Sequence, residues 1–79
     1  MSKKYKFKIE NTSYEWQNQF ITGSEVRGIG AGIPDSMDLY LKISGKVGRL
    51  VAKDEKIDLG QPGIEKFYCQ ESSSEAGSN

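Results

Sequence analysis

Histidine is absent from the 79-residue sequence, and cysteine occurs once, as Cys69. Without histidine, the chain lacks the side chain that most often serves as a general base near neutral pH and that most often binds transition metals. A single cysteine cannot form a disulfide within the chain, and such cysteine usage is typical of a reducing compartment. We therefore expect a non-enzymatic, cytoplasmic protein with no catalytic residues, cofactor or metal.

Net charge and long apolar runs are absent as well. The 11 basic and 11 acidic side chains give a formal charge of zero, so there is no broad positive field to attract nucleic acid or anionic lipid. No uncharged apolar run is long enough to cross a bilayer, and the basic N-terminus is not followed by the apolar stretch of a signal peptide. The sequence predicts one small soluble domain without nucleic-acid or membrane partners.

The first twenty residues have the two-residue hydrophobic period of β-strands. In residues 5–9, apolar side chains alternate with lysines, which predicts a strand with one buried face and lysines on the solvent face. Residues 14–20 alternate again, with Phe20 on the apolar side. Turn-forming residues 11–13 separate the two runs, so the sequence predicts a β-hairpin.

A short helix is predicted over residues 23–31. Thr22 can cap its start, and Glu25 occupies the reciprocal position of a capping box. Gly32 suits a left-handed C-terminal cap, and Pro34 blocks continuation. Gly28 and Gly30 fall in the interior of the helix, each costing roughly 1 kcal/mol relative to alanine. The sheet beneath must therefore hold the helix in place.

Further strands are predicted at residues 39–43, 49–52 and 64–69, where apolar alternation is flanked by turn signals. Residues 70–79 contain no large apolar side chain, so we expect a flexible tail after a folded domain of residues 1–69. The expected core consists of aromatic and aliphatic side chains from all these elements: Tyr5, Phe7, Ile9, Tyr14, Trp16, Phe20, Val26, Ile29, Leu39, Leu41, Ile43, Ile57, Leu59, Ile64 and Phe67.

The order of elements, β-β-α-β-β-β, predicts an α+β fold of the β-grasp type. In this arrangement one short helix crosses one face of a mixed sheet of four to five strands, and the last strand inserts beside the first. A small barrel of the OB or SH3 type is the main alternative. Such a barrel needs a strand at residues 22–32, where the sequence indicates a capped helix.

Four segments resemble the bacterial multiubiquitin-type ubiquitin-like proteins: residues 21–26 (ITGSEV), 31–34 (AGIP), 54–59 (DEKIDL) and 62–67 (PGIEKF). The Gly-Ile-Pro after the helix also resembles ubiquitin itself. The resemblance covers about residues 5–69 and implies a ubiquitin-like β-grasp domain. It further implies that the chain is a protein modifier, activated by an E1-like enzyme, passed to an E2-like enzyme and trimmed by a dedicated peptidase before conjugation to target proteins.

The C-terminus departs from ubiquitin, which ends in two glycines. This chain ends Ala76-Gly77-Ser78-Asn79. Our hypothesis is that a peptidase removes Ser78 and Asn79, leaving Ala76 and Gly77 as a small-residue end for conjugation. A sulfur-carrier protein of the same fold would need the missing glycine pair.

The solvent face of the predicted sheet holds a second candidate site. We expect Tyr40 and Tyr68 on neighbouring strands of this face, with Lys42 and Lys66 beside them. Aromatic anchors dominate many protein interfaces, so these residues are candidates for partner binding. The alternative is a cross-strand aromatic pair that only supports the sheet. The same face allows a non-conjugated docking module as the alternative function.

Four other features carry weaker signals. The glycines of residues 28–32 lie in or after the helix, so they do not match a dinucleotide-binding loop. The carboxylate pairs Asp35 with Asp38 and Asp54 with Glu55 lack a surrounding ligand set and are expected to be solvated. Cys69 has no histidine to activate it, so we expect a small buried hydrophobic residue rather than a nucleophile. The hypothesis that the chain is a nucleic-acid-binding barrel is supported only by the aromatic and basic residues of the predicted hairpin.

Overall fold

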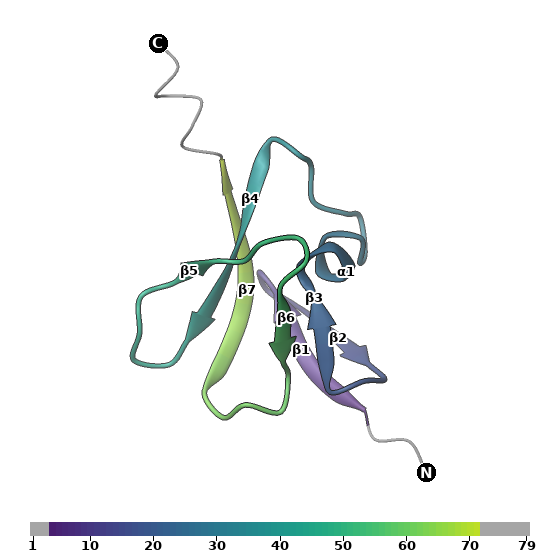
Figure 1. Ribbon diagram of the computed structural model, residues 1–79, viewed down its shortest axis with the longest axis vertical. Helices are drawn as coiled ribbons and strands as arrows, with labels where there is room; N and C mark the ends of the chain where they lie inside the picture. Colours follow the sequence, from purple (N-terminus) through teal and green to yellow (C-terminus); the bar gives the residue numbers. More distant parts are fainter. Residues whose placement is uncertain (1–3, 72–79) are drawn as a thin grey trace.

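The computed structural model describes residues 4–71 of the chain. These residues form a five-stranded sheet, a separate two-stranded ladder and one helix (Figure 1). The large sheet has the strand order β2-β1-β7-β4-β5, and β3 pairs with β6. In chain order the elements are β1 (Tyr5–Ile9), β2 (Thr12–Trp16), β3 (Phe20–Thr22), α1 (Gly23–Arg27), β4 (Met37–Ile43), β5 (Arg49–Leu50), β6 (Lys56–Asp58) and β7 (Ile64–Glu71).

The last strand lies in the middle of the large sheet, beside the first. β1 and β7 run parallel, with Ile9 opposite Phe67. β7 pairs antiparallel with β4, from Ile64 opposite Ile43 to the end of the strand. The predicted α+β β-grasp fold is confirmed. The barrel alternative is wrong, because residues 23–27 form a helix and not a strand.

β1 and β2 form the predicted hairpin, but the turn is earlier and tighter than expected. Ile9 lies opposite Thr12, so only Glu10 and Asn11 form the turn, and Glu10 has a φ of 54°. Thr12 and Ser13 were expected in the turn, yet they pair with β1, because a β-branched residue such as threonine fits a strand. The second strand starts at Thr12 and ends at Trp16, whereas the sequence predicted residues 14–20.

The predicted core position of Phe20 is wrong. Phe20 is 49% exposed, whereas Ile21 is completely buried. The chain leaves β2 at Trp16 and starts the new strand β3 at Phe20, where Ile21 lies opposite Ile57 of β6. The irregular residues 17–19 break the two-residue period. Ile21 rather than Phe20 therefore faces the core, since a shift of one residue exchanges the faces of a strand.

α1 begins where the sequence predicts. The backbone N–H of Glu25 donates to Thr22 Oγ1 at 3.2 Å, and the N–H of Thr22 donates to Glu25 Oε1 at 2.9 Å, which completes the capping box. The helix ends at Arg27 instead of continuing through the glycines that follow. The C-cap is Gly28, whose φ of −94° is right-handed, so the left-handed cap predicted at Gly32 is wrong. Gly30 and Gly32 lie beyond the helix end, with φ values of 65° and 85° that favour glycine and prevent the helix from continuing.

The start of α1 is joined to the segment before β6. The N–H groups of Gly23 and Ser24 donate to the carbonyls of Glu55 and Lys53, at 3.0 and 2.8 Å. A Cβ on Gly23 would overlap the carbonyl oxygen of Ala52, so only glycine permits this approach. The first N–H groups of a helix have no acceptor within the helix, and here carbonyl oxygens of the segment before β6 accept from two of them.

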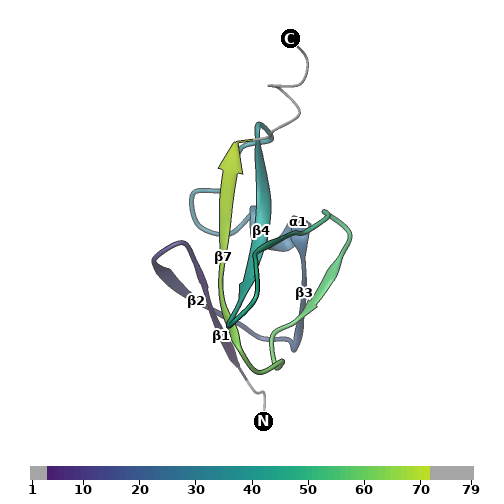
Figure 2. The ribbon, with the colours of Figure 1, turned by 90° about the vertical axis from the view of Figure 1, so that its left-hand side faces the viewer.

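The core lies between the large sheet and a layer made of α1, β3 and β6, which cover one face of that sheet (Figure 2). Ile21 and Val51 belong to it, although the sequence analysis did not include them. The other face of the large sheet is open to solvent. The buried side chains are Phe7, Ile21, Val26, Leu39, Leu41, Val51, Ile57, Leu59 and Phe67.

Candidate protein-interaction face and C-terminal segment

Two tyrosines stack on the solvent face of the large sheet. Tyr40 of β4 and Tyr68 of β7 are directly opposite each other, and their ring centroids are 5.4 Å apart with 16° between the ring planes. Their neighbours Leu41 and Phe67 point into the core, so strand alternation directs both tyrosines outward. Both are half-buried, which leaves part of the stack in contact with solvent.

The loop between β4 and β5 closes one side of this stack. The Gly48 backbone lies so close to Tyr68 that a Cβ on Gly48 would overlap the tyrosine hydroxyl. The loop is also tied to β4, because Lys42 Nζ donates to the backbone carbonyl of Lys46. These two contacts hold the loop against the edge of the aromatic pair.

Two exposed aliphatic side chains lie near this stack, one on the neighbouring strand and one in the loop that contacts Tyr68. Val47, in the loop, is 92% exposed, and Leu50 of β5 is 55% exposed. Leu50 lies directly opposite Tyr40, so it is on the same face of the sheet. The four residues Tyr40, Tyr68, Val47 and Leu50 are called the outer aromatic patch below.

Sequence reasoning missed both aliphatic members of the outer aromatic patch. Alternation around Val51 could have identified Leu50, because a buried Val51 requires Leu50 to point outward. Val47 gives no comparable signal, since it stands alone between lysine and glycine in a turn.

Lysines border the outer aromatic patch. Lys42 and Lys66 are directly opposite each other, two residues along their strands from the tyrosines and therefore on the same face. Lys6 and Lys8 alternate with buried Phe7 on β1 and therefore face the same side. Within residues 4–71, none of these four lysines forms an ion pair. The face thus combines exposed apolar groups with four lysines that form no ion pair within the described residues.

Cys69 follows the tyrosine on β7 and points toward the other side of the sheet, opposite Leu39. It is only partly buried. Its backbone N–H and its Sγ both lie close to Glu10 Oε2, at 3.1 and 3.5 Å. Burial raises the pKa of the Cys69 thiol, and the hydrogen bond to Glu10 raises it further. The thiolate needed for nucleophilic chemistry is therefore disfavoured.

Residues 5–71 match the multiubiquitin family. The chain belongs to the multiubiquitin family. No curated protein and no solved structure shows significant similarity to it. A ubiquitin-like domain such as this one acts through protein partners and is typically without enzymatic activity.

In this multiubiquitin domain, β7 continues to Glu71, beyond Cys69, where the sequence predicted the last strand to end. Glu71 lies opposite Met37, so the strand is paired up to its last residue. Ala76 and Gly77 lie outside the described residues, and their part in processing and conjugation stays a prediction.

Two of the four carboxylates that the sequence analysis singled out, Asp35 and Glu55, have charged partners in the multiubiquitin domain. Asp35 lies 3.7 Å from Lys53 Nζ. Arg49 donates to Glu55 Oε2 at 2.6 Å, and this bond lowers the pKa of the Glu55 carboxyl. The described residues contain no group of three potential metal ligands. Among the same residues, no helix is both long and apolar enough to pass through a bilayer.

Proposed function

We propose that this multiubiquitin domain is a protein modifier that is conjugated through its C-terminus to target proteins. Membership of the family carries this proposal. The placement of β7 supports it, because Glu71 ends the strand at the opposite end of the molecule from the start of β1 (Figure 1). The residues that follow Glu71 thus start from a defined point at one end of the sheet.

The chemistry of conjugation resides in the terminal carboxylate and not in the folded domain. An E1-like enzyme would join this carboxylate to the AMP part of ATP, with release of pyrophosphate. A cysteine thiolate of that enzyme would then displace AMP to form a thioester, which passes to an E2-like enzyme. A lysine amine of the target would finally displace the thiol and form an isopeptide bond. We propose Ala76 and Gly77 as the reacting end after a cytoplasmic peptidase has removed Ser78 and Asn79.

The role of the fold is to present surfaces that the enzymes recognise. The outer aromatic patch offers exposed apolar area beside Lys42 and Lys66, a composition that suits protein interfaces. We assign the patch to binding of the E1-like and E2-like enzymes, the peptidase or the target.

The test combines the chain with its cognate peptidase, E1-like enzyme, E2-like enzyme and ATP, followed by intact-mass measurement. We expect loss of Ser78 and Asn79, then a thioester that reducing agent cleaves, then a stable adduct on lysine. Gly77→Trp should block activation, because a bulky residue cannot enter a narrow channel, whereas Ser73→Ala should not. Cleavage at another position would refute the assignment of Gly77, and no adduct from an active enzyme set would refute conjugation.

A second function, a docking module that is never conjugated, is favoured by the 92% exposure of Val47 in the loop whose Gly48 lies against the stacked tyrosines. In that case, removal of residues 72–79 would leave partner affinity unchanged. Replacement of Tyr40 and Tyr68 by serine separates binding from support of the sheet. A loss of stability with unchanged affinity for the partner would leave the tyrosines only a structural role.

A further inference from the structure

The pairing between β1 and β7 is restricted to one position. Ile9 lies opposite Phe67, and no other residue pair joins the two strands in the described part of the chain. Toward their N-terminal ends the strands separate: in the register of the sheet, residues 6–8 lie opposite β2, and Ile64 and Lys66 lie opposite β4. In an antiparallel pair, alternate residues direct their N–H and C=O groups away from the partner strand. Two strand edges therefore face each other across a gap.

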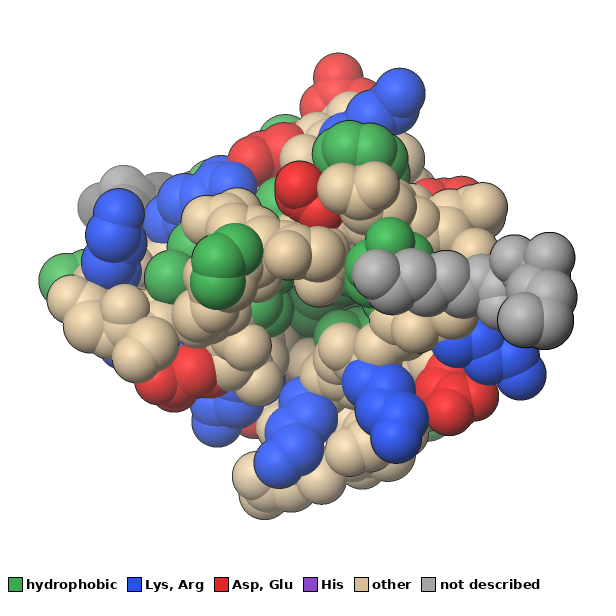
Figure 3. All heavy atoms as spheres, turned by 90° about the horizontal axis from the view of Figure 1, so that it is seen from below, with side chains coloured by type: hydrophobic (Ala, Val, Ile, Leu, Met, Phe, Trp, Pro, Cys, Tyr) green, Lys and Arg blue, Asp and Glu red, His purple; other side chains and the backbone are tan. Residues whose placement is uncertain are grey.

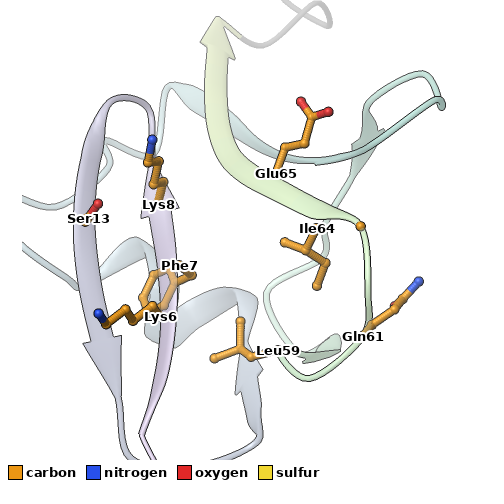
Figure 4. A pocket seen from close by; sticks show the side chains of 9 residues that line it. Lys6, Phe7, Lys8, Ser13, Leu59, Gln61, Ile64 and Glu65 are labelled. Atoms are coloured by element: carbon orange, nitrogen blue, oxygen red, sulfur yellow. The ribbon is translucent and has the colours of Figure 1, made fainter.

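A cavity of about 360 Å³ occupies this gap. Phe7, Leu59 and Ile64 contribute apolar surface, with Leu59 and Ile64 lying between the two strands (Figure 4). Seen from below, the centre of the molecule is hollowed, with hydrophobic side chains at the bottom of the hollow and lysine or arginine side chains on its rim (Figure 3). Part of the core is thus accessible from this end of the molecule.

The charges around the cavity are unbalanced. Lys6 and Lys8 extend from β1 on one side, and Glu65 from β7 on the other (Figure 4). No ion pair in the structure as described, residues 4–71, involves any of the three. On β2, Glu15 lies opposite Lys6 and is paired with Lys4, whereas uncharged Ser13 lies opposite Lys8. The β1 side of the cavity therefore carries two lysines that can meet carboxylates of a ligand.

We propose that this gap binds an extended segment of a partner protein with the pattern acidic–apolar–acidic. Such a segment adds to the free edge of β1 through backbone hydrogen bonds, as peptides do at other exposed sheet edges. Successive residues of a strand face opposite sides, so the apolar side chain enters the cavity while its two acidic neighbours face solvent beside Lys6 and Lys8. The cavity volume suits one bulky side chain such as leucine.

This binding site is separate from the C-terminus and from the outer aromatic patch. Its occupation needs neither ATP nor an activating enzyme, so its test is independent of conjugation. The probe is the blocked pentapeptide acetyl-Thr-Glu-Leu-Glu-Thr-amide, added to the isotope-labelled chain and followed by NMR. We expect saturable shifts of the backbone amides of Lys6, Lys8, Ile64 and Glu65, and weaker binding as salt is raised.

The double variant Lys6→Glu, Lys8→Glu should bind the peptide about tenfold more weakly, because two attractive cross-strand pairs become repulsive. Lys53→Glu with Lys56→Glu is the matched control, since it changes the net charge equally on other elements and should bind normally. Unchanged NMR shifts elsewhere would verify the fold, and Lys6→Gln with Lys8→Gln replaces the first variant if it unfolds.

Two control peptides define the specificity. We expect no saturable shifts with acetyl-Thr-Lys-Leu-Lys-Thr-amide, which reverses the charges, or with acetyl-Thr-Glu-Gly-Glu-Thr-amide, which lacks the apolar anchor. Equal binding of either control, unchanged binding by the Lys6 and Lys8 variant, or shifts confined to other residues would overturn the proposal.

Discussion

The hydroxyl of Tyr68 lies where a side chain on Gly48 would have to begin. The strand residue and the loop residue are therefore complementary, the long side chain of one filling the space left by the other. Tyr68 also stacks on Tyr40, which lies opposite Leu50. The shape of the outer aromatic patch thus depends on a glycine that contributes no side chain to it.

Gly48→Ala should destabilise the domain by about 1–3 kcal/mol, the usual cost of an added methyl group in a tightly packed site. The clash should be relieved when Tyr68 is also replaced by alanine, so the two effects should not add. Urea unfolding of the single and double variants measures this coupling. Gly28→Ala is the control, since its Cβ would meet no atom closer than 3.8 Å. Additive effects of Gly48→Ala and Tyr68→Ala would contradict the proposed packing.

Thr22→Ala should lower stability by about 1 kcal/mol, because it removes the acceptor for the N–H of Glu25 at the start of α1. Thermal or urea unfolding followed by circular dichroism measures the loss. Ser24→Ala, at an exposed position within the same helix, should have a much smaller effect. Equal losses in the two variants would show that the cap adds nothing specific.

Stability should depend on pH through Glu55. Its pKa is lowered chiefly by the hydrogen bond from Arg49, with a smaller contribution from the N–H of Ala52. A carboxyl whose pKa is lower in the folded state stabilises the fold above its unfolded pKa, and this stabilisation disappears as pH falls through the folded pKa.

Glu55→Gln should therefore reduce stability at neutral pH, by no more than about 1 kcal/mol for a surface ion pair. The difference from the unchanged chain should shrink as the pH is lowered below about 4. Unfolding curves across this range provide the measurement, with Glu65→Gln as the control for loss of one carboxylate. A difference that stays constant or grows in acid would contradict this linkage.

Cys69 should react slowly with iodoacetamide at mildly alkaline pH, because burial and Glu10 raise the pKa of its thiol and reduce the thiolate fraction. Glu10→Gln should speed the reaction, since it removes the negative charge while keeping an oxygen that can accept from the Cys69 N–H. Labelling rates in mass spectrometry test this, with the urea-unfolded chain as reference. Equal rates in the two folded proteins would exclude an influence of Glu10.

Local signals were sufficient to predict the fold but not all of its boundaries. Thr22 and Glu25 fixed the start of the helix, because a capping box depends only on residues close in sequence. Phe20 was misplaced because its apolar period was extended across residues 17–19, where the chain leaves one strand for another. No local pattern reveals that Ile21 will pair with Ile57, since this depends on two distant segments meeting.

The solvent face with its stacked tyrosines could also be predicted only in part from the sequence. Alternation indicated that Tyr40 and Tyr68 point outward, and the β-grasp topology placed their strands side by side. Sequence patterns did not indicate the contact of Gly48 with Tyr68 or the separation of β1 from β7, because both depend on tertiary packing. The cavity in that gap was therefore not predicted.

The bonds from Gly23 and Ser24 to the carbonyls of Glu55 and Lys53 have a consequence for folding kinetics. A five-residue helix cannot persist in isolation, so α1 has to await the arrival of a segment far along the chain. Closure of that long loop makes helix formation a late, non-local step. The amide hydrogens of Gly23 and Ser24 should then exchange with solvent only when the entire domain opens.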